Sequence, residues 1–72
     1  MPLTLIQPGR SVRIVSVNAG SGLQGRLSAL GLVPGAEVTV LQNCLRGPFI
    51  LGLGCGGRIA LGRGVANRIE VE

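Results

Sequence analysis

The sequence predicts a mainly β protein: a small barrel of five short strands, with one short α-helix after the first strand. Apolar residues alternate with other residues in several short runs, which is the period-two pattern of a strand with one buried face. Thirteen glycines and four prolines in a 72-residue chain that is 46% hydrophobic indicate tight turns between those runs. Because closing a small sheet removes its unpaired edges, we expect one barrel domain over residues 1–72.

The first two predicted strands each follow a Pro-Gly turn. Residues 7–15 (QPGRSVRIV) and 33–41 (VPGAEVTVL) both read Pro-Gly-x-x-Val-x-(Ile/Val). Pro-Gly favours a turn, and the alternation that follows it predicts a strand. Turn-then-strand units converge on this pattern easily, so the similarity does not require an internal repeat. The residues expected to face inward are Val12, Ile14, Val38 and Val40.

One helix is predicted between these two strands, in residues 21–32 (SGLQGRLSALGL). Ser21 and Gln24 have the spacing of a capping box at the start of a helix. Gly31 suits the left-handed position that ends a helix, with Leu32 folding back onto the last turn. Leucines at spacing i, i+4 and i+7 predict the packing face. They are Leu23, Leu27 and Leu30.

The second half of the chain reads as three short strands joined by glycine-rich turns. They are residues 48–54 (PFILGLG), 58–62 (RIALG) and 67–72 (NRIEVE). The link GRGVAN between the last two is too short for more than one helical turn. Alternation places seven apolar side chains inward. They are Phe49, Leu51, Leu53, Ile59, Leu61, Ile69 and Val71.

Charge is sparse and mostly positive. All seven basic residues are arginines, against three glutamates, and the arginines are spread along the chain, which is typical of a solubilising set. A small basic β barrel that binds nucleic acid is an alternative, because a net charge of +4 favours anionic partners. Such surfaces usually stack bases on aromatic side chains. The only aromatic residue, Phe49, belongs to an inward-facing pattern, so nucleic acid is not the expected partner.

The sequence predicts a cytoplasmic protein that does not insert into a membrane. The longest windows without charge, residues 14–25 and 47–57, are about half of the ~20 residues that a spanning helix needs. The opening residues MPLTLIQPG lack the basic region of a secretion signal. Two cysteines without a signal sequence fit a reducing compartment, where a stable disulfide is not expected.

The two cysteines, Cys44 and Cys55, flank the predicted strand 48–54. An extended strand of that length spans about 20 Å, whereas a disulfide joins Cα atoms roughly 4.4–6.8 Å apart. The same separation prevents the two thiolates from sharing one metal ion within a chain, and the sequence has no histidine and three glutamates. We therefore expect Cys44 and Cys55 to be small residues in turns. A metal site at these two cysteines is a candidate only between subunits.

Catalytic residue types are almost absent. The chain has no His, Asp, Lys or Tyr, so acid–base work would fall to Glu37, Glu70 and Glu72. Either cysteine would lack an adjacent base that activates it as a nucleophile. The protein is therefore not expected to be an enzyme.

A set of short motifs runs along the whole chain: Pro8-Gly9, residues 26–35 (RLSALGLVPG), Ile59-Ala60-Leu61, and Ala66, Ile69 and Val71. Together these motifs resemble the FeoA family, small cytosolic proteins of bacterial ferrous iron uptake. The family pattern has an opening Pro-Gly turn, a helix that ends in RL..(M/L)GL.PG, two hairpin strands, (I/L)AL, and A..I.V at the end. The resemblance implies an SH3-like five-stranded barrel.

The resemblance also implies an accessory role beside the membrane ferrous iron transporter that carries a GTP-binding domain. The protein would dock on the cytosolic face of this transporter, peripheral to the membrane, and support or regulate Fe²⁺ transport. No cofactor is firmly implied, although weak binding of Fe²⁺ or another divalent transition metal fits the family. A stand-alone relative of the C-terminal domain of iron-dependent repressors is another alternative, and the sequence leaves homo-oligomer formation open.

The surface around the end of the helix is the expected contact region, because SH3-like barrels recognise partners through grooves between loops. Leu32 and Val33 are apolar residues in a turn region, and the arginines at the rim would supply charged contacts. Alternatively, Leu32 packs on Leu27 and Val33 lines the barrel. The candidate partner-binding residues are Arg26, Leu32, Val33, Arg46 and Arg58.

Overall fold

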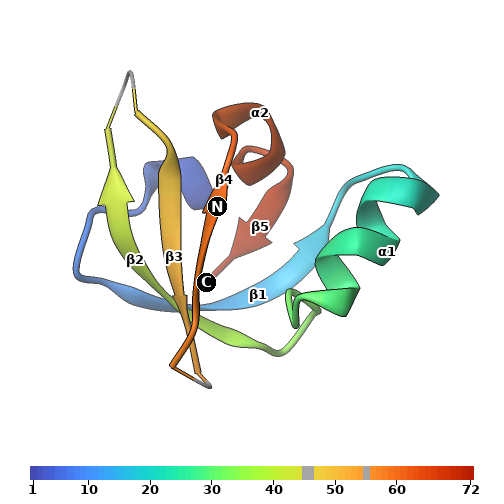
Figure 1. Ribbon diagram of the computed structural model, residues 1–72, viewed down its shortest axis with the longest axis horizontal. Coiled ribbons are helices and arrows are strands. Elements are labelled where there is room, and N and C mark those ends of the chain that lie inside the picture. Colours follow the sequence, from blue (N-terminus) through green and yellow to red (C-terminus); the bar gives the residue numbers. More distant parts are fainter. Residues whose placement is uncertain (45–46, 55) are drawn as a thin grey trace.

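A computed structural model describes residues 1–44, 47–54 and 56–72 (Figure 1). These residues form five strands, two α-helices and one 3₁₀ helix. In order, they are η1 (Leu3–Leu5), β1 (Ser11–Val17), α1 (Ser21–Ala29), β2 (Glu37–Asn43), β3 (Phe49–Leu53), β4 (Arg58–Leu61), α2 (Arg63–Ala66) and β5 (Ile69–Val71). The predicted five strands, with a helix after the first, are confirmed. The link between β4 and β5 forms a single helical turn, as its length predicted.

The strands form one antiparallel sheet in the order β4-β3-β2-β1-β5. β1 pairs with β2 and with β5, and its pairing with β5 shifts register between Ile14 and Ser16. Such a bulge increases the local twist, which lets one strand take part in both halves of a curved sheet. The segment β4–α2–β5 then returns across the open side of this sheet (Figure 1).

The two edges of the sheet differ. The outer side of β5 carries the N-terminal segment, because Val71 donates its backbone N–H to the Met1 carbonyl oxygen at 2.8 Å and Pro2 bridges Glu70. Within the part of the chain that the structure describes, β4 has a strand neighbour on one side only, β3. The expected full closure of the hydrogen-bonded ladder is therefore not found among the described residues, and α2 joins β4 to β5 instead of direct pairing.

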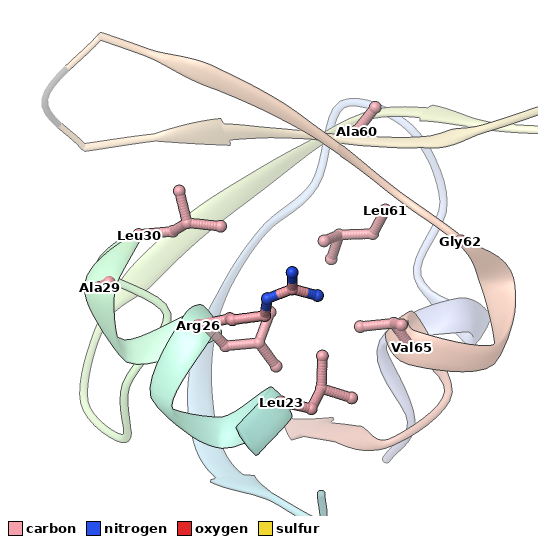
Figure 2. Close-up of a pocket in the computed structure, with 9 residues that line it drawn as sticks. Leu23, Arg26, Ala29, Leu30, Ala60, Leu61, Gly62 and Val65 are labelled. Atoms are coloured by element: carbon pink, nitrogen blue, oxygen red, sulfur yellow. The ribbon is translucent and has the colours of Figure 1, made fainter. Parts of the chain in front are cut away.

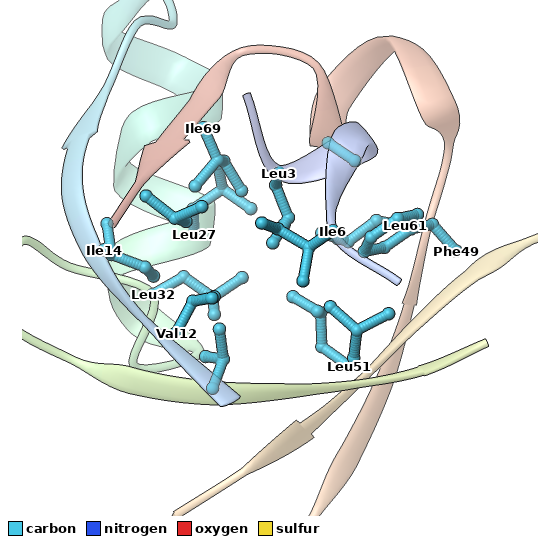
Figure 3. Packing of buried hydrophobic residues seen from close by; sticks show 14 residues of the cluster. Leu3, Ile6, Val12, Ile14, Leu27, Leu32, Phe49, Leu51, Leu61 and Ile69 are labelled. Atoms are coloured by element: carbon cyan, nitrogen blue, oxygen red, sulfur yellow. The ribbon is translucent and has the colours of Figure 1, made fainter. Parts of the chain in front are cut away.

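Apolar side chains fill the space enclosed by the sheet (Figure 3). Nine of the eleven residues expected to face inward are buried, whereas Leu53 and Ile59 are only half-buried. The structure adds Leu3 and Ile6 of the N-terminal segment, which precede the first predicted turn. The buried residues are Leu3, Ile6, Val12, Ile14, Leu27, Leu32, Val38, Val40, Phe49, Leu51, Leu61, Ala66, Ile69 and Val71.

The end of α1 follows the prediction and its start does not. Gly31 has φ +89° and donates its N–H to the Ser28 carbonyl oxygen at 3.0 Å, while Leu32 donates to the Leu27 carbonyl oxygen at 2.9 Å. These two bonds make a Schellman motif. The predicted capping box is wrong, because Ser21 is already the first helical residue and the N-cap position falls to Gly20, which has no side chain to cap with.

Candidate functional site

An open groove of about 520 Å³ runs between α1 and the segment formed by β4 and α2 (Figure 2). Apolar side chains from both sides make its walls, and one charged side chain enters it. The lining residues are Leu23, Arg26, Leu27, Ala29, Leu30, Ala60, Leu61, Gly62 and Val65.

The apolar character of this groove follows from how α1 packs. Of the three leucines in the predicted stripe, Leu27 is buried in the core with 2% exposure, Leu23 is half-buried and Leu30 is 47% exposed. Leu23 packs only partly against the core, and Leu30 is the C-cap residue just after this nine-residue helix, so both of these leucines also face the groove. Opposite them, Val65 on α2 and Leu61 on β4 point toward the same space (Figure 2).

Arg26 is the charged residue that lines the groove, and its guanidinium group points into it (Figure 2). Within the described parts of the chain, no hydrogen bond or ion pair engages this group. The ion pair that the described residues do form lies outside the groove and joins the Met1 ammonium to a Glu70 carboxylate oxygen at 2.7 Å. None of the three glutamates lines the groove, so it presents apolar walls together with a positive charge.

A polar network fixes the α2 wall. Asn43, at the end of β2, donates from Nδ2 to the carbonyl oxygens of Thr4 at 3.0 Å and Ile6 at 2.8 Å. Its Oδ1 atom accepts from Arg63 Nη1 at 2.6 Å. The first residue of α2 is thus tied to β2 and to the N-terminal segment. This attachment sets the position of Val65 across the groove from α1.

The candidate contact residues predicted from the sequence fall in different places. Arg26 lines the groove, and Arg58 is exposed at the start of β4. Val33 is 37% exposed in the turn after α1, but it does not line the groove. Leu32 needs correction: it is 1% exposed, because the Schellman motif folds it onto the core, so its side chain is not available to a partner. Arg46 lies outside the described residues.

Sequence reasoning missed the apolar walls of the groove. Leu23 and Leu30 were assigned to packing, and Val65 was treated as part of a short link. A signal was present around α1, because two leucines in the nine-residue helix and a third at its C-cap carry more apolar surface than one turn against a small core can bury. Locating the groove also requires knowing that β4 and α2 lie opposite α1, and local sequence patterns do not predict how distant elements are placed.

The cysteines are only partly described. Cys44 is exposed just after β2, and its backbone carbonyl oxygen accepts a hydrogen bond from Arg63 Nη1 at 3.0 Å. Cys55 lies outside the described residues. Across residues 1–44, 47–54 and 56–72, no three or more His, Cys, Asp or Glu side chains come together in a group that could hold a metal ion. A site shared between subunits stays a prediction.

Two further features bear on the classes of partner. Phe49 has 0% exposure, so the one aromatic side chain is not available for stacking on a nucleic-acid base. No helix in the described segments is both long and apolar enough to cross a lipid bilayer.

Comparison with known proteins decides the family. The FeoA domain matches this chain over residues 1–72. The chain belongs to the FeoA family. A protein of Methanocaldococcus jannaschii named "Putative Fe(2+) transport protein A" is 37% identical over 71 residues, which cover 99% of this chain and 84% of the relative.

Solved FeoA structures have the same fold. The crystal structure of an iron uptake regulatory protein (FeoA) superposes with a TM-score of 0.91 at 36% identity, covering 100% of this chain and 95% of the other. FeoA of Stenotrophomonas maltophilia, solved in complex with zinc and described as an SH3 domain protein, gives a TM-score of 0.84 at 30% identity, covering 100% and 89%. The SH3-like fold predicted from the FeoA resemblance is therefore confirmed.

Proposed function

We propose that this FeoA-family protein is an accessory protein of ferrous iron uptake. It docks on the cytosolic part of the GTP-binding membrane iron transporter and supports or regulates Fe²⁺ transport there. The names of its relatives support the process, because the M. jannaschii relative is named for Fe²⁺ transport and the S. maltophilia protein is described as a possible transport activating factor. By this proposal the protein is cytoplasmic, acts by contact and reaches the membrane through its partner.

The single observation that carries the docking proposal is the unfilled apolar groove beside α1. Leu30 keeps 47% of its surface exposed there, next to the half-buried Leu23 and Val65. Burying apolar surface stabilises a complex by about 25 cal/mol per Å², so a partner side chain that enters this groove gains binding energy. A contiguous apolar site with a polar or charged rim is typical of a protein–protein contact.

The arginines around the groove complete the proposed surface. Arg26 lies within it, and Arg58 is exposed on β4 at its far end from α2. Arginine is enriched in interfaces because its planar guanidinium group can bind carboxylates with two hydrogen bonds. Val33 and Arg46 stay candidates for the periphery of the contact.

Co-purification with the full-length transporter tests this proposal. Membranes that contain the transporter are solubilised under reducing conditions, and the tagged protein is used to retain it. We expect retention by the wild type and an increase in Fe²⁺ accumulation when the protein is restored to cells that lack it. If the transporter is not retained and uptake is the same with and without the protein, the docking function is wrong.

A further inference from the structure

We infer that the groove receives an extended segment of the partner, rich in apolar and acidic residues, which pairs with the open edge of β4 as an additional strand. The inference rests on the proposed function in one respect, that the groove is the docking surface. It adds how the partner is held and which chemistry the partner segment carries.

The first support is the state of the β4 edge. β4 pairs with β3 in the register Phe49↔Leu61, Ile50↔Ala60, Leu51↔Ile59 and Gly52↔Arg58. One step further along, Leu53 donates its backbone N–H to the Gly57 carbonyl oxygen at 2.8 Å.

Backbone groups of an antiparallel strand point alternately to its two sides. The backbone C=O of Gly57 points toward β3, so the backbone N–H and C=O groups of Ile59 and Leu61 point toward β3 as well. The N–H and C=O groups of Arg58 and Ala60 therefore point away from the sheet. In the described residues, no backbone hydrogen bond joins these outward groups to another segment.

The second support is the contrast with the other edge of the sheet. β5 is covered by the N-terminal segment, whose Met1 carbonyl oxygen accepts from Val71 N–H. No segment among the described residues covers β4 in this way, and Ala60 and Gly62 are exposed there and line the groove. An exposed strand edge is a template for pairing with another chain, and the short length of β4 limits the added strand to about four residues.

The third support is that the groove lies directly beside this edge. Ala60, Leu61 and Gly62 form one wall of it, and Leu23 and Leu30 form the other (Figure 2). Side chains alternate across a strand. Every second side chain of a strand added to β4 would therefore face the apolar groove, while its backbone satisfied the outward groups of Arg58 and Ala60.

The positive charge of the groove and of β4 indicates the chemistry of the partner segment. Arg26 stands in the groove without an ion pair in the described chain, and Arg58 is exposed on the pairing strand. The three glutamates do not line the groove, and the net charge of the chain is +4. A second copy of this chain would bring the same positive charge to the contact. A partner segment with acidic residues is complementary instead.

A short peptide tests the recognition itself. The probe is an acetylated, amidated seven-residue peptide that alternates valine and glutamate, and the matched control alternates valine and lysine. We expect the glutamate peptide to bind about ten-fold more tightly. We also expect its largest amide shift changes in nuclear magnetic resonance spectra at Arg58 and Ala60. Equal affinities, no binding at millimolar concentration, or shift changes confined to other strands would overturn the inference.

A pair of substitutions at Ala60 tests the backbone pairing. Ala60→Pro removes the outward N–H without removing a bond to β3, and proline is tolerated on such an edge. Ala60→Val keeps the N–H and is the matched control. We expect Ala60→Pro to weaken the binding of the glutamate peptide and of the transporter by about ten-fold. We expect Ala60→Val to keep both affinities within about two-fold of the wild type. Unfolding curves of both variants check that the fold is kept.

The outcomes separate this inference from the proposed function. If the wild type binds the glutamate peptide at β4 but does not retain the transporter, strand pairing stands and the transporter role fails. If both Ala60 variants retain the transporter like the wild type, docking stands and strand addition is overturned. The wild type is also measured without peptide at increasing concentration. Self-association that shifts the amide signal of Ala60 would place a second copy at this edge, and this result would also overturn the inference.

Discussion

Arg63 Nη1 lies 2.6 Å from Asn43 Oδ1, and this hydrogen bond joins the start of α2 to the end of β2. The same asparagine holds the N-terminal segment through the carbonyl oxygens of Thr4 and Ile6. One side chain thus connects three parts of the fold that are far apart in sequence. The position of α2, and with it one wall of the groove, depends on this partly buried amide.

Replacement of that amide should destabilise the protein. Asn43→Ala removes three hydrogen bonds and leaves partly buried backbone oxygens without a partner, which costs about 1–3 kcal/mol. Gln42→Ala is the matched control, because Gln42 makes one exposed bond of 3.3 Å to the Pro48 carbonyl oxygen. Its expected cost is below about 0.5 kcal/mol. Urea unfolding measures the free energy of unfolding of both variants, and equal values for Asn43→Ala and Gln42→Ala would contradict the role of Asn43.

Two glycines, one inside α1 and one just after it, should respond to alanine in opposite directions. A Cβ atom at Gly31 or Gly25 would meet nothing within 4 Å, so space does not distinguish them. Gly31 has φ +89°, where alanine is strained by about 1–2 kcal/mol. Gly25 lies inside the helix, where alanine is favoured by up to about 1 kcal/mol. Thermal unfolding should show a lower melting temperature for Gly31→Ala and a higher one for Gly25→Ala.

Neighbouring apolar residues after α1 should differ sharply in their contribution to stability. Leu32→Ala creates a cavity in the core and should cost about 2–5 kcal/mol. Val33→Ala, at 37% exposure, should change the free energy of unfolding by about 0.5 kcal/mol or less. Denaturant titration of both variants distinguishes a core residue from a surface residue. A small effect of Leu32→Ala would restore it as a candidate contact.

Metal binding should not depend on the thiol of Cys44. It is exposed, and the described residues gather no set of ligands around it. In anaerobic calorimetric titrations with Zn²⁺ and with Fe²⁺, we expect equal, weak binding by the wild type, Cys44→Ser and the double variant Cys44→Ser/Cys55→Ser. Tight binding that is lost in either variant would indicate a thiolate site between subunits.

The sequence is most informative where a local physical rule acts alone. Alternation identified the inward residues of β2 and β5, because a pleated strand leaves no other choice of face. Gly31 was predictable because a left-handed residue that ends a helix strongly favours glycine. Local rules failed where two arrangements satisfy them equally, as at Ser21, which can begin a helix as well as cap it.

The groove depends on contacts between distant segments, so it could not be located from local patterns. Arg26 was identified as a contact residue, but Leu30 was assigned to packing because leucine spacing alone does not show how much of a helix the core covers. Whether the core reaches Leu30 depends on where β4 and α2 cross α1, more than 25 residues later in the chain. For Leu32 the sequence left a partner contact and packing on Leu27 both open, because a turn residue can face either way, and the structure buries it.

The most direct test of the central claim compares two exposed leucines. Leu30, at 47% exposure, lines the groove, and Leu41, at 43% exposure on β2, does not. The binding of each aspartate variant to the full-length transporter in membranes is measured at one salt concentration, after unfolding curves confirm the fold. Our account predicts that Leu30→Asp weakens binding by about ten-fold or more, whereas Leu41→Asp binds like the wild type. Equal binding by the two variants would contradict docking through the groove.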